Sequence, residues 1–107
     1  MKWMILLCLT IAPSAHGEGL YYYCSTTSTF RATQYFSDVF AVPPGTNPLT
    51  VKNRFLSYLA VHYNESLGAK TLCFPSDDLR LAGIDQGKEL LVYQNMRWRV
   101  VMTHWHF

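Results

Sequence analysis

The chain has little charge and lacks the motifs of common enzyme and nucleotide-binding families. Charged residues make up 15% of it; removing Lys2 from the nine Lys and Arg leaves eight, against seven Asp and Glu. The basic residues are scattered, which excludes the clustered footprint of a protein that binds nucleic acid or an anionic membrane. There is no Gly-x-Ser-x-Gly elbow and no Gly-rich phosphate loop. The sequence therefore predicts no catalytic residue and no cofactor.

The first seventeen residues, 1–17, have the pattern of a secretory signal peptide. Lys2 supplies the positive end, residues 3–11 the apolar run, and Ala15 and Gly17 the small residues that a signal peptidase reads. Cleavage after Ala15 is an alternative. The apolar run is shorter than the about 20 residues that span a bilayer, and no later run approaches that length. We expect an exported protein, secreted or periplasmic, with no transmembrane segment after cleavage.

Cysteine is scarce. Cys8 is removed with the predicted signal peptide, and Cys24 and Cys73 remain. In an oxidising compartment two thiols most simply form one disulfide. Its loop of about 50 residues contributes about 4 kcal/mol to stability in the chain-entropy model. The absence of a Cys-x-x-Cys motif argues against a redox-active pair.

Residues 18–107 carry the pattern of a single small α+β domain. Alternating or β-prone runs, breaker residues and helical spacing predict strands over 20–25, 33–42, 71–74 and 97–107, with helices over 50–64 and 76–93. A Ser/Thr cluster over 25–29 predicts a turn. The order ββαβαβ favours a two-layer sandwich, in which a four-stranded mixed or antiparallel sheet carries both helices on one face.

The two expected helices differ in the quality of their spacing. Thr50 is the expected cap of the first, and Ser76, followed by two Asp, that of the second. The first has one apolar stripe, formed by Val51, Phe55, Tyr58, Leu59 and His62. The second has a weaker stripe, formed by Leu79, Ala82, Gln86, Leu90 and Tyr93. A shorter second helix followed by a strand over 89–93 is an alternative.

The mature chain resembles small exported bacterial domains with a Cys-Ser start, a Cys-Phe middle and one disulfide. The matching segments are Tyr23-Cys24-Ser25, Tyr35 to Phe40, Cys73-Phe74, and Val100-Val101 before Trp105. The resemblance covers nearly all of the mature chain, and it implies the fold and the disulfide but no activity or ligand. His104 departs from the pattern, because a Gly is expected before the Trp.

Histidines form a candidate metal site. His104 and His106 stand two apart on a predicted strand, so both side chains face the same side and fit a Zn or Cu ion. His62, on the apolar stripe of the first helix, is the candidate third ligand. The alternative is aromatic packing at the end of the chain.

Aromatic side chains form a candidate binding surface. Strand alternation places Tyr21 and Tyr23 on the face opposite Cys24, and Trp105 on the face opposite Trp98. If exposed, they would stack on a glycan or anchor a protein partner; if a helix covers them, they are core.

Two polar positions carry further hypotheses. Asp38 alternates with Phe36 and Phe40, which is typical of a hydrogen-bonded structural acid and less often of a catalytic one. Asn64-Glu65-Ser66 is a glycosylation sequon, usable only in a eukaryotic secretory pathway.

These patterns together predict a non-enzymatic binding or interaction module in the periplasm or outside the cell. Its expected partner is an unidentified protein or glycan and not a nucleic acid. The alternative is a small secreted hydrolase that acts on cell-envelope or host polymers.

Overall fold

The computed structural model describes residues 20–65 and 70–107. The predicted signal peptide, residues 1–17, and Ser66 of the sequon lie outside the described residues. Within the described part of the chain, no helix is long and apolar enough to cross a membrane.

A five-stranded mixed sheet is built around one long central strand, β1 (Leu20–Ser28). One edge of β1 pairs antiparallel with both β2 (Thr33–Phe36) and β3 (Phe40–Val42), and the other edge pairs antiparallel with β4 (Leu72–Ser76). The last strand, β5 (Arg99–Met102), lies parallel to β2. The expected α+β class and mixed sheet are confirmed, with five strands instead of four.

The extra strand arises because the expected strand over 33–42 is interrupted at 37–39. Ser25 pairs with Phe36 and Tyr22 with Phe40, so four steps along β2–β3 match three along β1. One extra residue is therefore inserted opposite β1, as in a β-bulge. Ser37 holds the insertion: its backbone N–H donates to Cys24 O (2.9 Å), and its Oγ accepts from Cys24 N (2.8 Å).

The turn expected over 25–29 is wrong, because β1 continues through the Ser/Thr cluster to Ser28. β-branched threonines suit strands, and here their hydroxyls find partners. Thr71 Oγ1 donates to Thr26 Oγ1 (2.7 Å), and Thr27 Oγ1 donates to Gln34 Oε1 (2.6 Å). The chain reverses afterwards, ending at Ala32, whose φ is 49°.

Helix α2 (Pro48–Tyr63) begins two residues before the expected cap, Thr50. Asn47 is the N-cap, and its Oδ1 accepts the backbone N–H of Leu49 (2.9 Å). Pro48 fits the first turn, because it has no N–H to leave without a partner.

Helix α3 (Leu79–Asn95) runs without a break through 89–93, so the alternative strand there is excluded. Asp78, not Ser76, is its N-cap: Oδ1 of Asp78 accepts the backbone N–H groups of Arg80 (2.8 Å) and Leu81 (3.2 Å). Ser76 Oγ instead accepts the Asp78 N–H (3.2 Å) and orients the cap.

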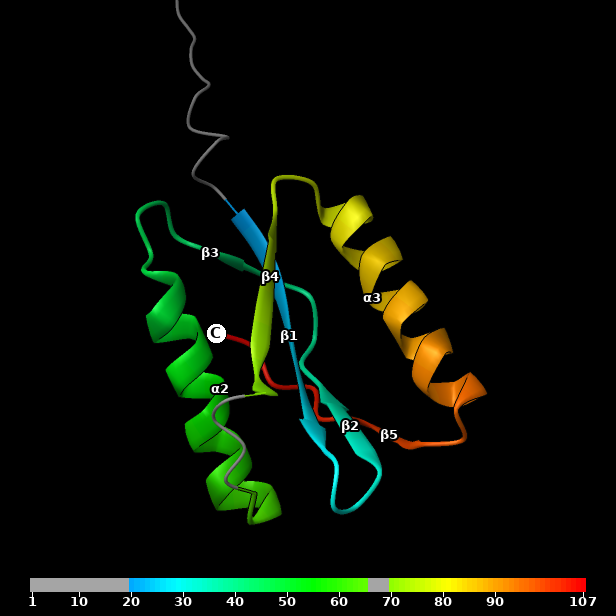
Figure 1. The fold of residues 1–107 in the computed structure, drawn as a ribbon. Coiled ribbons are helices and arrows are strands. Elements are labelled where there is room, and N and C mark those ends of the chain that lie inside the picture. Colours follow the sequence, from blue (N-terminus) through cyan, green and yellow to red (C-terminus); the bar gives the residue numbers. More distant parts are fainter. Residues whose placement is uncertain (1–19, 66–69) are drawn as a thin grey trace, which may run out of the picture.

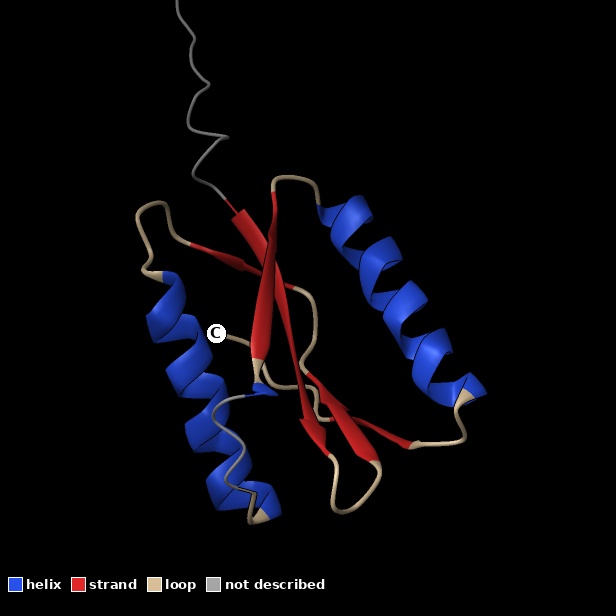
Figure 2. Cartoon of the chain, in the orientation of Figure 1, coloured by secondary structure: helices blue, strands red, loops and turns tan. Residues whose placement is uncertain are grey.

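The two helices cover opposite faces of the sheet (Figures 1 and 2). The expectation that both lie on one face is therefore wrong. Successive residues of β1 point to opposite faces. Tyr22 and Cys24 pack in the core beneath α2, whereas Tyr23 and Ser25 reach α3. A sheet with large or hydrogen-bonding side chains on both faces needs a layer on each.

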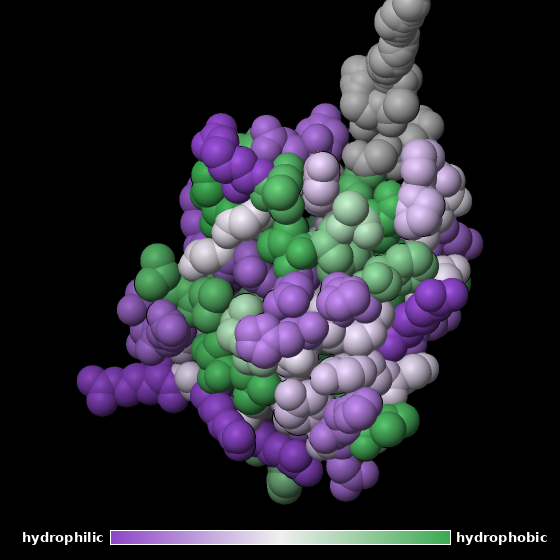
Figure 3. Space-filling model, turned by 180° about the vertical axis from the view of Figure 1, so that it is seen from behind, coloured by the Kyte–Doolittle hydropathy of each residue, from purple (hydrophilic) through white to green (hydrophobic). Residues whose placement is uncertain are grey.

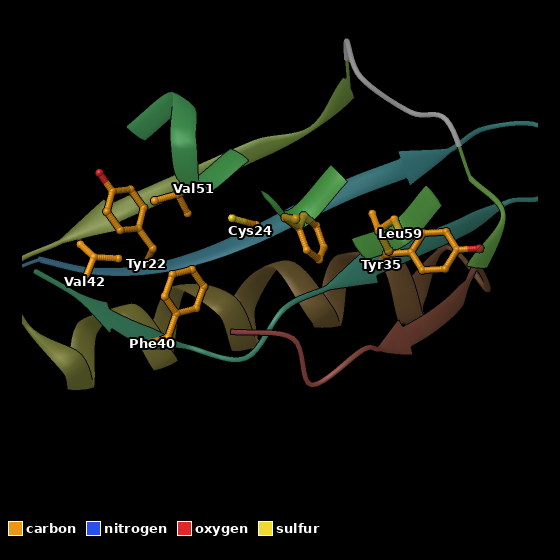
Figure 4. Packing of buried hydrophobic residues seen from close by; sticks show 8 residues of the cluster. Tyr22, Cys24, Tyr35, Phe40, Val42, Val51 and Leu59 are labelled. Carbon is orange, nitrogen blue, oxygen red and sulfur yellow. The ribbon is translucent and has the colours of Figure 1, made fainter. Parts of the chain in front are cut away.

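The hydrophobic core lies between the sheet and α2 (Figure 4). Helix α2 contributes Val51, Phe55 and Leu59, which are fully buried. The strands contribute Tyr22, Cys24, Tyr35, Phe40 and Val42. The expected stripe on the first helix is thus confirmed for its three fully buried residues, whereas its last residue, His62, lies exposed beside Tyr58.

The predicted disulfide is present. Cys24 on β1 and Cys73 on β4 are direct cross-strand partners with Cα atoms 4.0 Å apart. Cys24 is completely buried and Cys73 is half-buried. The bridge therefore links the central strand to a strand 49 residues away in sequence.

Candidate functional site

Helix α3 is held on the sheet by a carboxylate that three side chains share. Glu89 accepts hydrogen bonds from Tyr23 Oη (2.8 Å) and Ser25 Oγ (2.8 Å), both on β1. Gln34 Nε2 on β2 adds a longer contact (3.4 Å). Hydrogen bonds to an ionised acceptor are stronger than neutral ones, so this cluster fixes the rotation of α3 about its axis.

The rest of the inner side of α3 comprises a small residue, an aromatic residue and an amide. Ala82 is the only buried residue of the helix, and the Tyr93 ring meets Phe36 edge-on, with centroids 6.5 Å apart. Gln86 Nε2 donates to the carbonyl of Ser37 in the bulge (2.7 Å). The stripe expected on this helix is thus only partly an inner face, since Leu79 is more than half exposed.

This arrangement raises the pKa of the Tyr23 hydroxyl. Burial and the hydrogen bond to the Glu89 carboxylate raise the pKa of Tyr23, and the negative charge of Asp85 adds to the rise. Deprotonation would put a phenolate beside a carboxylate with little water near it. Tyr23 therefore stays a hydrogen-bond donor at any physiological pH.

The outward side of α3 carries several exposed apolar side chains, whereas the outward side of a surface helix is normally polar. Leu81, Ile84, Leu91 and Val92 are between 41% and 59% exposed. They stand at i, i+3, i+10 and i+11, which places them on one side of the helix. Figure 3, viewed from behind, shows hydrophobic patches among hydrophilic ones on the side where α3 lies.

Two opposite charges lie within this apolar stripe. Asp85 and Lys88 stand four and seven residues after Leu81, and both are exposed. Neither makes an ion pair with another residue in the part of the chain that the structure describes. We call the set formed by these two and the four apolar residues the α3 outer face: Leu81, Ile84, Asp85, Lys88, Leu91 and Val92.

An acid–histidine pair lies where the bulge at residues 37–39 meets the C-terminal segment. His104 Nδ1 is 3.1 Å from Asp38 Oδ1, and both side chains are at least partly exposed. The Asp38 backbone N–H donates to the carbonyl of Trp105 (2.9 Å), which fixes the crossing of the two segments. Neighbouring Ser37 is fully buried, and its hydroxyl donates to the Asp38 carbonyl (2.7 Å). The pair thus has the groups for acid–base chemistry, but the Ser37 hydroxyl is buried and is not accessible as a nucleophile.

The three predicted metal ligands are not brought together. His62 stacks on Tyr58, His104 contacts Asp38, and His106 Nδ1 lies 3.3 Å from the carbonyl of Phe107. The described residues contain no group of three or more His, Cys, Asp or Glu placed to hold a metal ion. The same-face argument fails because β5 ends at Met102, and His104 has a φ of 62°.

The predicted aromatic surface is divided between the two faces of the sheet. Tyr23 is 4% exposed beneath α3, whereas Trp105 packs between Phe40 and Phe55 beneath α2, with both centroid distances 5.3 Å. Tyr21 and Trp105 are both partly exposed. Tyr23 and Trp105 follow the alternative expectation, in which helices cover them and they are core.

A second carboxylate is buried near the end of α2. Tyr35 Oη donates to Glu65 Oε2 (2.6 Å), and the Arg31 guanidinium lies 3.1 Å from the same oxygen. Burial, followed by the Glu65 contact, raises the pKa of Tyr35, and Arg31 opposes the rise. The Glu65 carboxylate thus has a hydrogen-bond donor and a cation as partners within the fold. The cluster joins the β1–β2 hairpin to the end of α2.

A shallow pocket of about 260 Å³ lies between the start of α2 and β4. Its lining is mainly apolar and comprises Pro48, Leu49, Lys52, Thr71, Leu72 and Cys73. Its lining includes one cationic side chain, Lys52, and no acidic one, which is too few convergent polar groups for acid–base catalysis.

Comparisons with protein-family models, with curated proteins and with solved structures found no match. The sequence patterns described above do not predict the α3 outer face, although its apolar residues have helical spacing. Residues 81, 84, 91 and 92 form a helical stripe of their own, in competition with the stripe that starts at Leu79.

Proposed function

We propose that the mature chain is an exported, non-enzymatic binding module whose protein-binding surface is the α3 outer face. The observation that carries the proposal is the inverted polarity of α3. Two of its polar side chains, Gln86 and Glu89, bind the sheet, while the apolar Leu81, Ile84, Leu91 and Val92 are exposed. Exposed apolar residues gathered on one element are typical of an interaction site, whereas single ones are normal.

The energy available on this surface suits a binding site. Complete burial of one Leu, Ile or Val side chain is worth about 1.5–3 kcal/mol. Four side chains that are about half exposed therefore leave about 3–6 kcal/mol to be gained from a partner that covers them. A protein partner suits the surface better than a glycan, because sugar rings stack on aromatic side chains and the α3 outer face has none.

The Glu89 cluster supports the proposal by holding the surface in place. Three donors from β1 and β2 fix Glu89, so a partner meets a preformed helix and loses little free energy in ordering it. The disulfide and the predicted signal peptide suit an oxidising compartment, which is why we place the function in the periplasm or outside the cell.

Site-specific photo-crosslinking tests the proposal. A photo-reactive amino acid replaces Leu91 on the α3 outer face in one variant, and Val61 on α2 in the other. Val61 is a matched control because it is a helical apolar residue that is even more exposed, 79% against 59%. We expect a crosslinked protein species in the native compartment from position 91 and none from position 61. Equal crosslinking from both, or none from 91, would contradict the proposed surface.

One observation favours the alternative function, a small secreted hydrolase: the Asp38–His104 pair. An imidazole next to a carboxylate is the general-base half of many hydrolytic sites. A screen with peptide, glycan, lipid and nucleic-acid substrates tests this reading. Turnover that disappears in both Asp38→Ala and His104→Ala, with the circular-dichroism spectrum unchanged, would replace the binding module by an enzyme.

A further inference from the structure

The α3 outer face has a charge pattern that is complementary to itself. Leu81, Asp85, Lys88 and Val92 are spaced i, i+4, i+7 and i+11, so at about 100° per residue they fall within an arc of about 60°. Read from either end, the order is apolar, charged, charged, apolar, and the two charges are opposite. The centre of the pattern lies between Gln86 and Gly87.

We propose that this face binds the same face of a second copy of the chain, with the two α3 helices antiparallel about a two-fold axis. This inference rests on the proposed function and names the partner of that surface. With the axis between positions 86 and 87, Asp85 of one copy lies opposite Lys88 of the other, and the pairing occurs twice. Leu81 of each copy then packs on Val92 of the other. A two-fold interface needs such a self-complementary patch.

The flanking side chains fit the same arrangement. Ile84 and Leu91 stand on one side of the charged pair of residues, and a two-fold axis across the helices keeps that side common to both copies. Ile84 of one copy therefore lies within about one half-turn of Leu91 of the other. Four aliphatic side chains gather beside the two ion pairs and shield them from water on that side, which strengthens their attraction.

The same features argue for a second copy over a membrane surface. A helix that lies on an anionic membrane carries an excess of Lys and Arg along its polar side. The α3 outer face instead has one acid and one base, both free of ion pairs among the described residues. The contact spans the twelve residues from Leu81 to Val92, or about 17 Å. Such an interface buries less than about 1,200 Å² in total, so we expect a reversible dimer of micromolar affinity.

Charge exchange tests the pairing. In Asp85→Lys both central charges become positive, and in Lys88→Asp both become negative, so each variant alone should repel its own copy. We expect sedimentation velocity to show a monomer–dimer equilibrium for the disulfide-bonded wild type and a dissociation constant raised at least tenfold for each variant. An equimolar mixture of the two variants should dimerise again, because every contact then joins opposite charges.

Two further variants control for net charge and folding. Asp77→Lys and Arg80→Asp make the same changes in charge at exposed positions outside the face, and they should dimerise like the wild type. Restored dimerisation in the mixture also shows that both central variants are folded. The pairing is refuted if the mixture stays monomeric while the wild type dimerises, or if the wild type is monomeric at 1 mM.

The outcomes separate this inference from the proposed function. A monomeric wild type that still crosslinks to another protein through position 91 keeps the binding surface and overturns the second copy as its partner. A dimer that ignores all four charge variants overturns the antiparallel pairing. If position 91 neither crosslinks to another protein nor to a second copy, both proposals fall.

Discussion

Removal of the Cys24–Cys73 disulfide should cost this domain a large part of its stability. The two cysteines are neighbours across β1 and β4 but are separated by 49 residues in sequence. The benefit of a crosslink depends on the length of the loop that it closes in the unfolded chain. For a loop of this size the chain-entropy model gives about 4 kcal/mol at 25 °C. A small domain has only about 5–15 kcal/mol in total, so the unbridged protein should be marginal.

The measurement is urea unfolding at neutral pH, followed by tryptophan fluorescence. Three samples separate the crosslink from side-chain packing: oxidised wild type, reduced wild type, and the double variant Cys24→Ala, Cys73→Ala. Reduction keeps both sulfur atoms, so its effect reports the crosslink alone, and the midpoint should fall by about 2–4 M. The double variant should lose about 1 kcal/mol more, because Cys24 is completely buried and its sulfur leaves a small void.

A loss of less than about 1 kcal/mol on reduction would refute the reasoning, since it would mean that the unfolded chain gains little freedom when the bridge opens. Intact mass before and after reduction is the accompanying check on the starting material. A wild-type protein from an oxidising compartment that carries two free thiols would contradict the bridge itself.

Three further predictions concern single side chains. Glu89→Ala removes the acceptor shared by Tyr23, Ser25 and Gln34 and should lower the free energy of unfolding by about 2–4 kcal/mol. Glu89→Gln keeps an acceptor, so its loss of stability should be smaller. Equal losses for the two variants in urea unfolding would argue against the anchoring role of the carboxylate. Because the pKa of folded Tyr23 is raised above the usual 10.0, the stability that this group contributes is complete below pH 10 and is lost as the pH rises beyond 10. Tyr23→Phe should therefore lose stability less steeply above pH 10 than the wild type, and identical slopes in alkaline urea titrations would count against the raised pKa. His104 has a φ of 62°, so His104→Gly should be more stable than His104→Ala by about 1 kcal/mol, since both lack the ring and differ only in backbone freedom; an alanine variant as stable as the glycine one would exclude this backbone geometry.

The features that could be predicted from the sequence are those that depend on local pattern. Alternation along β1 places Tyr22 and Cys24 together and Tyr23 opposite, because successive strand residues must point to opposite faces. The spacing of Val51, Phe55 and Leu59 places them on one side of α2, and all three are fully buried. The two cysteines outside the predicted signal peptide leave one intramolecular pairing.

Two predictions of secondary structure are wrong because contacts between residues far apart in the sequence outweigh the local pattern. The Ser/Thr cluster is polar enough for a turn, yet Thr26 and Thr27 stay in β1 because Thr71 and Gln34 satisfy their hydroxyls. At the end of the chain, a β-prone run stops at Met102 because the segment turns at His104 to cross the bulge at Asp38.

The orientation of α3 was decided by the tertiary structure alone. Its sequence holds two stripes at helical spacing, one beginning at Leu79 and one at Leu81, and hydrophobic periodicity has no means of choosing between them. The choice is made by Glu89, whose hydrogen-bond donors lie 55 to 66 residues earlier in the chain. Those donors sit on a sheet face that needs an acceptor, since buried hydroxyls without partners are costly. Satisfying them turns Glu89 toward the sheet and leaves Leu81, Ile84, Leu91 and Val92 exposed.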